Sequence, residues 1–185
     1  MSKPLAEFLV KHMKEYDKVV FSSQEYIDAA VKAGLPSEKA ELIHPIANTD
    51  LFRKMDIDTK KIRKKHGLPE NGRILLSVQR VDPKSGHEQL IRAMPEVIKK
   101  VPDAKLVFVG SESMSSRLSR EREEMLNNVK NLVNELGIGE NVFFTGNIDY
   151  NELPEVYNSV DAVALCSRNE GFGLSVTEGM ACHNP

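Results

Sequence analysis

Glu170 and Glu178 flank a glycine-rich turn near the end of the 185-residue chain. The apolar run before this turn, from Asp161 to Cys166, is typical of a buried parallel strand. After the turn, apolar residues recur at helical spacing from Leu174 to Ala181. The predicted order is therefore strand, turn and helix. In open α/β sheets, ligands bind at such turns, outside the carboxyl ends of the strands.

The residue types in this turn suit a ligand that carries both a phosphate and a sugar. Gly171 and Gly173 lack a Cβ atom, which lets a ligand approach the backbone closely. Free N–H groups at the start of the following helix can bind an anion, whereas the two carboxylates would accept hydrogen bonds from hydroxyl groups. The alternative interpretation is that Glu170 only ends a strand and that Glu178 is a solvated helix residue.

A second glycine-containing turn, residues 80–86, also follows a predicted strand. Its Arg80 and Lys84 could both face a diphosphate, the arginine through a planar fork of donors and the lysine as a point charge. Alternatively, they are two surface cations beside a turn. Further strand ends, at Gly110-Ser111 and Gly146-Asn147, are predicted to line the same rim. One crevice assembled from several loops is the usual geometry of a nucleotide site.

Composition and missing motifs argue against several other classes of protein. The net charge of −2 and the pI near 6.2 give no electrostatic footprint for nucleic acid or an anionic membrane. No apolar run approaches the roughly 20 residues of a membrane-spanning helix, and the N-terminus lacks a signal-peptide pattern. The Gly-x-Gly-x-x-Gly fingerprint and the Gly-x4-Gly-Lys-Ser/Thr loop are absent, which argues against nicotinamide enzymes and P-loop ATPases.

The two cysteines do not form a disulfide framework. Cys166 lies in a predicted strand and is interpreted as a small core residue. Cys182-His183 could be half of a metal site, but no partner cluster accompanies it, so no metal site is predicted. A reducing, cytoplasmic location fits this cysteine content.

Alternating strands and helices predict an α/β fold, a Rossmann-like parallel sheet with helices on both faces. The predicted strands are residues 17–22, 40–44, 74–78, 106–109, 142–145 and 161–166. Ser22 with Glu25 is interpreted as a capping box and Gly137 as a helix-ending residue. Pro95 predicts a kink or a loosened turn in its helix. The basic run at residues 60–65 is interpreted as a solvated face.

Five stretches of the sequence occur in an order that resembles the donor-binding, C-terminal half of a family 4 retaining glycosyltransferase with the GT-B fold. They are Arg80…Lys84-Ser85-Gly86, residues 106–110, residues 142–146, residues 152–157 and Glu170-Gly171-Phe172-Gly173…Glu178-Gly179. The resemblance implies a nucleotide-sugar donor domain over residues 45–185, and residues 1–44 look like the end of a preceding acceptor-side domain. Residues 7–9, 16–21 and 168–178 are also similar to trehalose-forming synthases.

This resemblance implies a hexosyltransferase that uses a nucleotide diphosphate sugar without a cofactor or a metal, because cations and helix ends stabilise the departing phosphate. The implied catalytic residues are Arg80, Lys84 and Glu170, with Glu170 accepting hydrogen bonds from the sugar. Glu178 would bind the ribose hydroxyls, and the backbone near Val142 would meet the base. The implied donor-binding residues are Gly110, Ser111, Val142, Phe143, Gly146, Gly171, Phe172, Gly173, Leu174 and Glu178.

Two positions depart from the family pattern. The family's phosphate-binding lysine follows the arginine by five residues, where this chain has Ser85, so either Lys84 substitutes for it or donor affinity is reduced. Gln79 stands where many members have a small residue and is expected to crowd the turn.

The alternation calls for one more strand after Ala181, which predicts a truncated fragment with an uncovered sheet edge or helix face. The isolated chain is then expected to lack full activity and to need the acceptor-side domain from a partner chain or a homo-oligomer. One alternative is a noncatalytic, truncated or split module that binds a nucleotide sugar or a partner chain. A nucleotide-sugar epimerase fits less well, because the two glutamates around Gly-Phe-Gly belong to the transferases.

Overall fold

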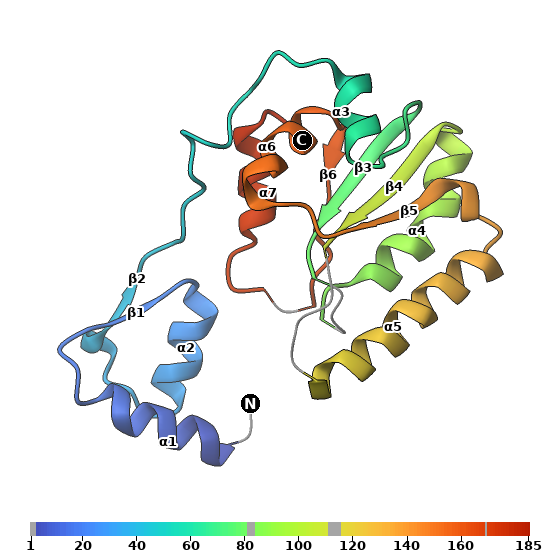
Figure 1. Ribbon diagram of the computed structural model, residues 1–185. Coiled ribbons are helices and arrows are strands. Elements are labelled where there is room, and N and C mark those ends of the chain that lie inside the picture. Colours follow the sequence, from blue (N-terminus) through green and yellow to red (C-terminus); the bar gives the residue numbers. More distant parts are fainter. Residues whose placement is uncertain (1–2, 81–83, 111–115, 169) are drawn as a thin grey trace. The chain divides into compact units, whose positions relative to one another are not determined.

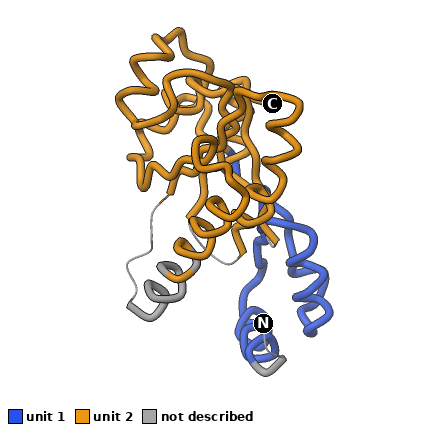
Figure 2. Tube along the Cα trace, turned by 90° about the vertical axis from the view of Figure 1, so that its right-hand side faces the viewer, with its two compact units in different colours: residues 1–46, 170–172 blue, residues 47–169, 173–185 orange. Residues whose placement is uncertain are grey.

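The computed structural model describes residues 3–80, 84–110, 116–168 and 170–185 (Figure 1). The chain forms two compact units, coloured separately in Figure 2. The first comprises Met1–Ile46 with Glu170–Phe172, and the second comprises Ala47–Asn169 with Gly173–Pro185. The first boundary between the two units lies after Ile46, two residues beyond the domain boundary that the sequence predicts after His44. The assignment of the two stretches to acceptor and donor domains stays a prediction.

The first unit contains a small parallel sheet with helices beside it. Its elements are α1 (Lys3–Met13), β1 (Val19–Phe21), α2 (Gln24–Lys32), the 3₁₀ turn η1 (Ser37–Lys39) and β2 (Ala40–Leu42). Strands β1 and β2 pair in parallel, and Val10, Ala30 and Leu35 form the core of the unit.

The cap of α2 corrects one detail of the sequence analysis. Ser23, not Ser22, is the N-cap residue, because its backbone is extended and its hydroxyl accepts a hydrogen bond from the N–H of Tyr26. The expected capping box of Ser22 and Glu25 was therefore wrong, because the N-cap lies one position later and N3 is then Tyr26.

The second unit is built on a four-stranded, fully parallel sheet. Its strands are β3 (Arg73–Val78), β4 (Ala104–Val109), β5 (Val142–Gly146) and β6 (Ala162–Val163), in the order β5-β4-β3-β6. Five α-helices and two short 3₁₀ turns accompany them in the described part of this unit. They are α3 (Thr59–Lys65), α4 (His87–Lys100), α5 (Ser116–Glu135), η2 (Gly139–Asn141), η3 (Tyr150–Glu152), α6 (Leu153–Asn158) and α7 (Leu174–Ala181).

Helices cover both faces of this sheet, as predicted. Successive side chains of a strand point to opposite faces: Leu106 and Phe108 of β4 pack with α4 and α5, whereas Val107 and Val109 pack with α6. Figure 1 shows α4 and α5 on one side of the sheet and α6 and α7 on the other. The α/β class and the parallel, two-faced sheet are thus confirmed, and α4 runs as one helix through Pro95.

The last strand is shorter than expected. Only Ala162 and Val163 pair with β3, and the N–H of Ala164 donates the last hydrogen bond of this edge to Leu76. The chain then leaves the sheet, so Cys166 is exposed. The interpretation of Cys166 as a core residue was therefore wrong, whereas Cys182 is buried in the core.

The basic run on α3 is not uniformly solvated. Arg63 is buried and donates to the carbonyl oxygens of Ser159 (2.8 Å) and Gly72 (2.9 Å) and to the carboxylate of Asp161 (3.2 Å). This one residue therefore ties α3 to the chain segments that enter β3 and β6. Among the helices that the structure describes, none is both long enough and apolar enough to cross a bilayer.

Candidate functional site

The carboxyl ends of three strands meet closely in the second unit. The N–H of Gly110, after β4, donates to the carbonyl oxygen of Gly146 at the end of β5 (2.8 Å). A Cβ atom on Gly110 would lie 2.2 Å from the carbonyl oxygen of Gln79, after β3. Only glycine fits between these neighbours, so β3, β4 and β5 end at one rim, as the sequence predicts. Ser111, the next candidate residue, lies outside the described residues.

The loop after β3 is fastened to the segment after β6. The N–H of Arg168 donates to the carbonyl oxygen of Lys84 (2.7 Å). A Cβ atom on Gly86 would lie 1.9 Å from the carbonyl oxygen of Cys166. The two loops therefore pack backbone against backbone, which brings a fourth strand end to the same rim.

Gln79 links these two loops and does not crowd the turn. Its side-chain amide donates to the carbonyl oxygen of Ser85, and its amide oxygen accepts from the hydroxyl of Ser167. Ser85, at the position of the family's lysine, is buried and donates its hydroxyl to the carbonyl oxygen of Arg80 (2.7 Å). Ser85 therefore ties the two described ends of this loop together, and Arg80 and Lys84 at those ends are exposed.

The implied base-binding residues do not all reach this rim. Gly146 ends β5 there, but Val142 begins β5, pairs with Leu106 and is buried in the core. Phe143 is half-buried and packs in the core on the opposite face. Gly146 lies four positions after Val142, which is roughly 13 Å at the usual rise of a strand. The structure thus brings Gly146, but not the side chain of Val142, to the carboxyl edge.

Glu178 is a buried carboxylate in α7. It accepts a hydrogen bond from the hydroxyl of Tyr157 (3.2 Å), and the hydroxyl of Tyr150 lies close enough to influence its pKa. Burial raises the pKa of Glu178 above its usual value, although the two phenols oppose this shift. Burial also raises the pKa of Tyr157, so both phenols remain protonated. The reading of Glu178 as a solvated helix residue does not hold.

Two glycines position α7 against the rest of the second unit. Gly173 precedes the helix in the left-handed region (φ +85°) and is buried, and Leu174, the first helical residue, is exposed. A Cβ atom on Gly179 would lie 2.7 Å from a methyl group of Val163. The helix therefore packs directly on β6 and carries Glu178 toward α6.

The turn from Glu170 to Glu178, here called the acidic-glycine turn, begins in the first unit, which includes Glu170–Phe172. A Cβ atom on Gly171 would lie 3.0 Å from the hydroxyl of Ser22 and 3.2 Å from the ring of Tyr26. The ring of Phe172 stacks on His44, with 5.1 Å between centroids. Glu170 is exposed, and its carboxylate accepts a hydrogen bond from the N–H of Gly171 (3.2 Å).

The turn is thus divided between the units, which sequence reasoning missed. No periodicity or motif in the chain signals this division. The joint action of Glu170, Arg80 and Lys84 on one ligand stays a prediction.

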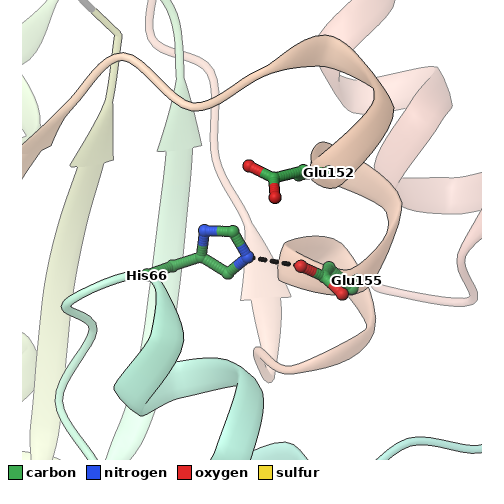
Figure 3. A group of neighbouring side chains, drawn as sticks. All are labelled: His66, Glu152 and Glu155. Carbon is green, nitrogen blue, oxygen red and sulfur yellow. Dashed lines mark hydrogen bonds and ion pairs between the residues drawn. The ribbon is translucent and has the colours of Figure 1, made fainter.

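His66, Glu152 and Glu155 form a group whose ligand-type atoms lie within 4.8 Å of one another (Figure 3). The ring of His66 bonds to Glu155, as Figure 3 shows. Lys65 bridges both carboxylates, with its ammonium 3.0 Å from Glu152 and also paired to Glu155. The ammonium group of Lys65 already balances part of the negative charge of Glu152 and Glu155 that would otherwise attract a metal ion. The group therefore acts as an ion-pair network that joins α3 to α6.

This network predicts a loss of stability in acid. Burial pushes the pKa of Glu155 upward, but hydrogen bonds and charges from Lys65 and His66 outweigh it, so the pKa lies below its usual value of 4.5. A carboxyl group with a lowered pKa stabilises the fold above pH 4.5 and loses that effect as the pH falls through the lower, folded value. Urea unfolding of wild type and Glu155→Gln should therefore differ at pH 7 and converge in acid.

The exposed pair of Glu96 and Lys99 provides the control for this prediction. Glu96→Gln should change stability little at any pH, because exposed ion pairs contribute little. A difference between wild type and Glu155→Gln that persists unchanged in acid would contradict the assigned role of Glu155.

Comparisons with known proteins match this chain to glycosyltransferases. The family described as Glycosyl transferases group 1 matches residues 58–185. A GDP-mannose-dependent alpha-(1-6)-phosphatidylinositol monomannoside mannosyltransferase of Mycolicibacterium smegmatis is 30% identical over 178 residues, which are 96% of this chain and 43% of the relative. Mannosylfructose-phosphate synthase of Agrobacterium fabrum is 28% identical over 172 residues, which are 91% of this chain and 37% of the relative.

Solved structures show the same fold. Anabaena HepE in complex with UDP and glucose has a TM-score of 0.86 at 22% identity, over 100% of this chain and 48% of that one. Sucrose-phosphate synthase from Thermosynechococcus elongatus has a TM-score of 0.79 at 26% identity, over 100% of this chain and 43% of that one. The predicted fold, the C-terminal half of a GT-B enzyme, is thereby confirmed. The chain spans less than half the length of each of these proteins.

Proposed function

This chain belongs to the group 1 glycosyl transferases, and on that basis we propose that it is the donor-binding half of a retaining enzyme. The enzyme moves a hexose from a nucleotide diphosphate sugar to an acceptor, in the cytoplasm. The observation that carries the proposal is the rim of the second unit, where glycines let the ends of four parallel strands touch. Such an edge is where open α/β sheets bind nucleotides.

The charges on the loop after β3 suit a diphosphate. Arg80 and Lys84 are exposed at the two described ends of this loop, which hydrogen bonds of Gln79 and Ser85 hold together. A preorganised cation stabilises the charge that develops on a departing nucleotide, so no metal is required. Retention of configuration follows when the acceptor attacks from the face that the nucleotide leaves. The named GDP-mannose dependence of one relative, and the UDP bound in one neighbouring structure, support a nucleotide-sugar donor.

We further propose that the acceptor is a sugar and that the product is trehalose. It rests on the likeness of residues 7–9, 16–21 and 168–178 to trehalose-forming synthases. Product analysis of the whole enzyme with glucose and glucose phosphates as acceptors tests it. A product other than trehalose would contradict this subtype and leave the donor proposal intact.

Calorimetric titration with UDP, GDP and ADP at up to millimolar concentration tests donor binding by this chain. We expect at least one of them to bind, and tighter binding of a matching nucleotide sugar. The absence of binding by all three nucleotides and their sugar conjugates would overturn the proposal.

Glu170→Ala is expected to weaken binding of the nucleotide sugar by about 10-fold or more, because a charge-assisted hydrogen bond contributes about 1.5–3 kcal/mol. Binding of the nucleotide alone should change little, since the lost contact is to the sugar. Calorimetry with both ligands measures the two effects, and Glu140→Ala, another exposed glutamate, is the matched control. Equal losses for sugar nucleotide and nucleotide would contradict the role assigned to Glu170.

A further inference from the structure

Two tyrosines converge on the carboxylate of Glu178 from outside its own helix. Tyr157 comes from α6 and is completely buried, and Tyr150 comes from η3 and is about half exposed. The hydroxyl of Tyr157 donates to Glu178 (3.2 Å), and that of Tyr150 lies near enough to the carboxylate to influence its pKa. In the described part of the chain, the side chain of Glu178 interacts with these phenols and with no basic side chain. A buried carboxylate held only by neutral donors is costly for a fold, which points to a use in binding.

The hydrogen-bonding capacity of Glu178 is only partly used. An ionised carboxylate offers about four acceptor sites, and the phenol of Tyr157 occupies one of them. This donor also fixes the direction in which the remaining lone pairs point. Two neighbouring hydroxyl groups of a ligand would match what is left.

We propose that Tyr150 and Tyr157 are positioning residues that orient Glu178 as a receptor for the vicinal hydroxyls of a ribose. This inference rests on the proposed function, in which Glu178 faces the ribose of the donor nucleotide. The tyrosines thereby set the preference of the site for ribonucleotides over deoxyribonucleotides.

The hydroxyl of Tyr157 is separable from the packing of its ring. The ring lies edge-on to Phe52, with 5.8 Å between centroids, and borders Gly179. A phenylalanine would keep these contacts and lose only the donor to Glu178. The same holds for Tyr150, whose ring lies edge-on to Phe52 at 5.2 Å. Tyrosine-to-phenylalanine variants therefore test the hydrogen bonds without emptying the core.

Calorimetry of the full chain compares UDP and GDP with their 2′-deoxy and 3′-deoxy forms. Wild type should prefer the ribonucleotide by about 10-fold or more, the usual worth of a hydrogen bond to a charged group. Tyr157→Phe should reduce that preference to about one third or less, and Tyr150→Phe should act in the same direction. Tyr16→Phe, at an exposed tyrosine of the first unit, is the control and should keep the full preference.

The pH dependence of the ribose preference distinguishes a positioning role of the tyrosines from a role in packing alone. Tyr150, Tyr157 and the thiol of Cys182 are the titratable groups recorded around Glu178 in the described residues. Burial raises the pKa of Cys182 to about 11, so this thiol stays neutral near pH 7. Loss of a phenol donor removes a bond to the ionised carboxylate and raises the pKa of Glu178. The pH below which the ribose preference disappears should therefore be higher in Tyr157→Phe.

Each outcome of these titrations supports or contradicts a named part of the inference. A reduced preference with a thermal midpoint near that of wild type, and an upward shift of the pH profile, support the inference. An unchanged preference in both phenylalanine variants overturns the role of the tyrosines, and equal binding of ribonucleotides and deoxyribonucleotides by wild type overturns the role of Glu178. If wild type binds no nucleotide or nucleotide sugar at all, the proposed function itself fails.

Discussion

Gly86→Ala should lower the free energy of unfolding by about 2–5 kcal/mol. The left-handed backbone at Gly86 (φ +71°) costs about 1–2 kcal/mol with any side chain. The new Cβ atom would also overlap the carbonyl oxygen of Cys166, 1.9 Å away, and overpacking adds about 1–3 kcal/mol. Urea unfolding measures the loss, and nucleotide affinity should fall with it, because the clash pushes the loop of Arg80 away from the rim.

Gly137→Ala is the matched control for this experiment. Gly137 has nearly the same backbone angle (φ +66°), but nothing lies within 4 Å of the position of its Cβ atom. Its substitution should therefore cost only the backbone strain of about 1–2 kcal/mol. If Gly86→Ala destabilises the protein no more than Gly137→Ala, the two loops do not pack as described.

Arg63→Ala should lower the free energy of unfolding by roughly 3–5 kcal/mol. The substitution leaves the carbonyl oxygens of Ser159 and Gly72 without their donor, and each unsatisfied buried group costs about 1–3 kcal/mol. The ion pair with Asp161 adds less, because that carboxylate is 49% exposed. Arg63→Lys should recover only part of the loss, since an ammonium cannot reach three acceptors with the geometry of a guanidinium.

Arg92 provides the comparison for Arg63. It forms an exposed ion pair with Glu88 one turn earlier in α4, so Arg92→Ala should change the unfolding free energy by less than about 0.5 kcal/mol. Thermal and urea unfolding of both alanine variants would reveal the contrast. Similar small losses at the two positions would show that the buried network does not hold α3 in place.

The sequence was informative wherever a local pattern decides the outcome. Apolar runs such as Leu106–Val109 are buried on both faces, and that pattern predicts a parallel sheet between layers of helices. The positions of glycines after strands and before helices indicated where the strand ends meet. The absence of a Cβ atom matters most where two backbone segments nearly touch. Gly86 and Gly110 are such positions.

The sequence was misleading where long-range partners decide the outcome. Arg63 looked like one cation among several, and only the fold places two carbonyl oxygens and a carboxylate around it. Glu178 could equally have faced solvent, since its burial depends on Tyr157 from another helix. Cys166 follows a genuine strand but lies beyond the last paired residue. Such details follow from tertiary contacts that periodicity does not encode.

The division of the acidic-glycine turn between the two units has a consequence for dissecting the protein. The chain passes from one unit to the other after Ile46, before Glu170 and after Phe172. A recombinant piece that began at Ala47 would retain the helix of Glu178. It would separate Gly171 and Phe172 from Ser22, Tyr26 and His44. Cutting the chain after Ile46 would thus remove the surroundings of the turn that begins at Glu170, the residue proposed above to contact the sugar.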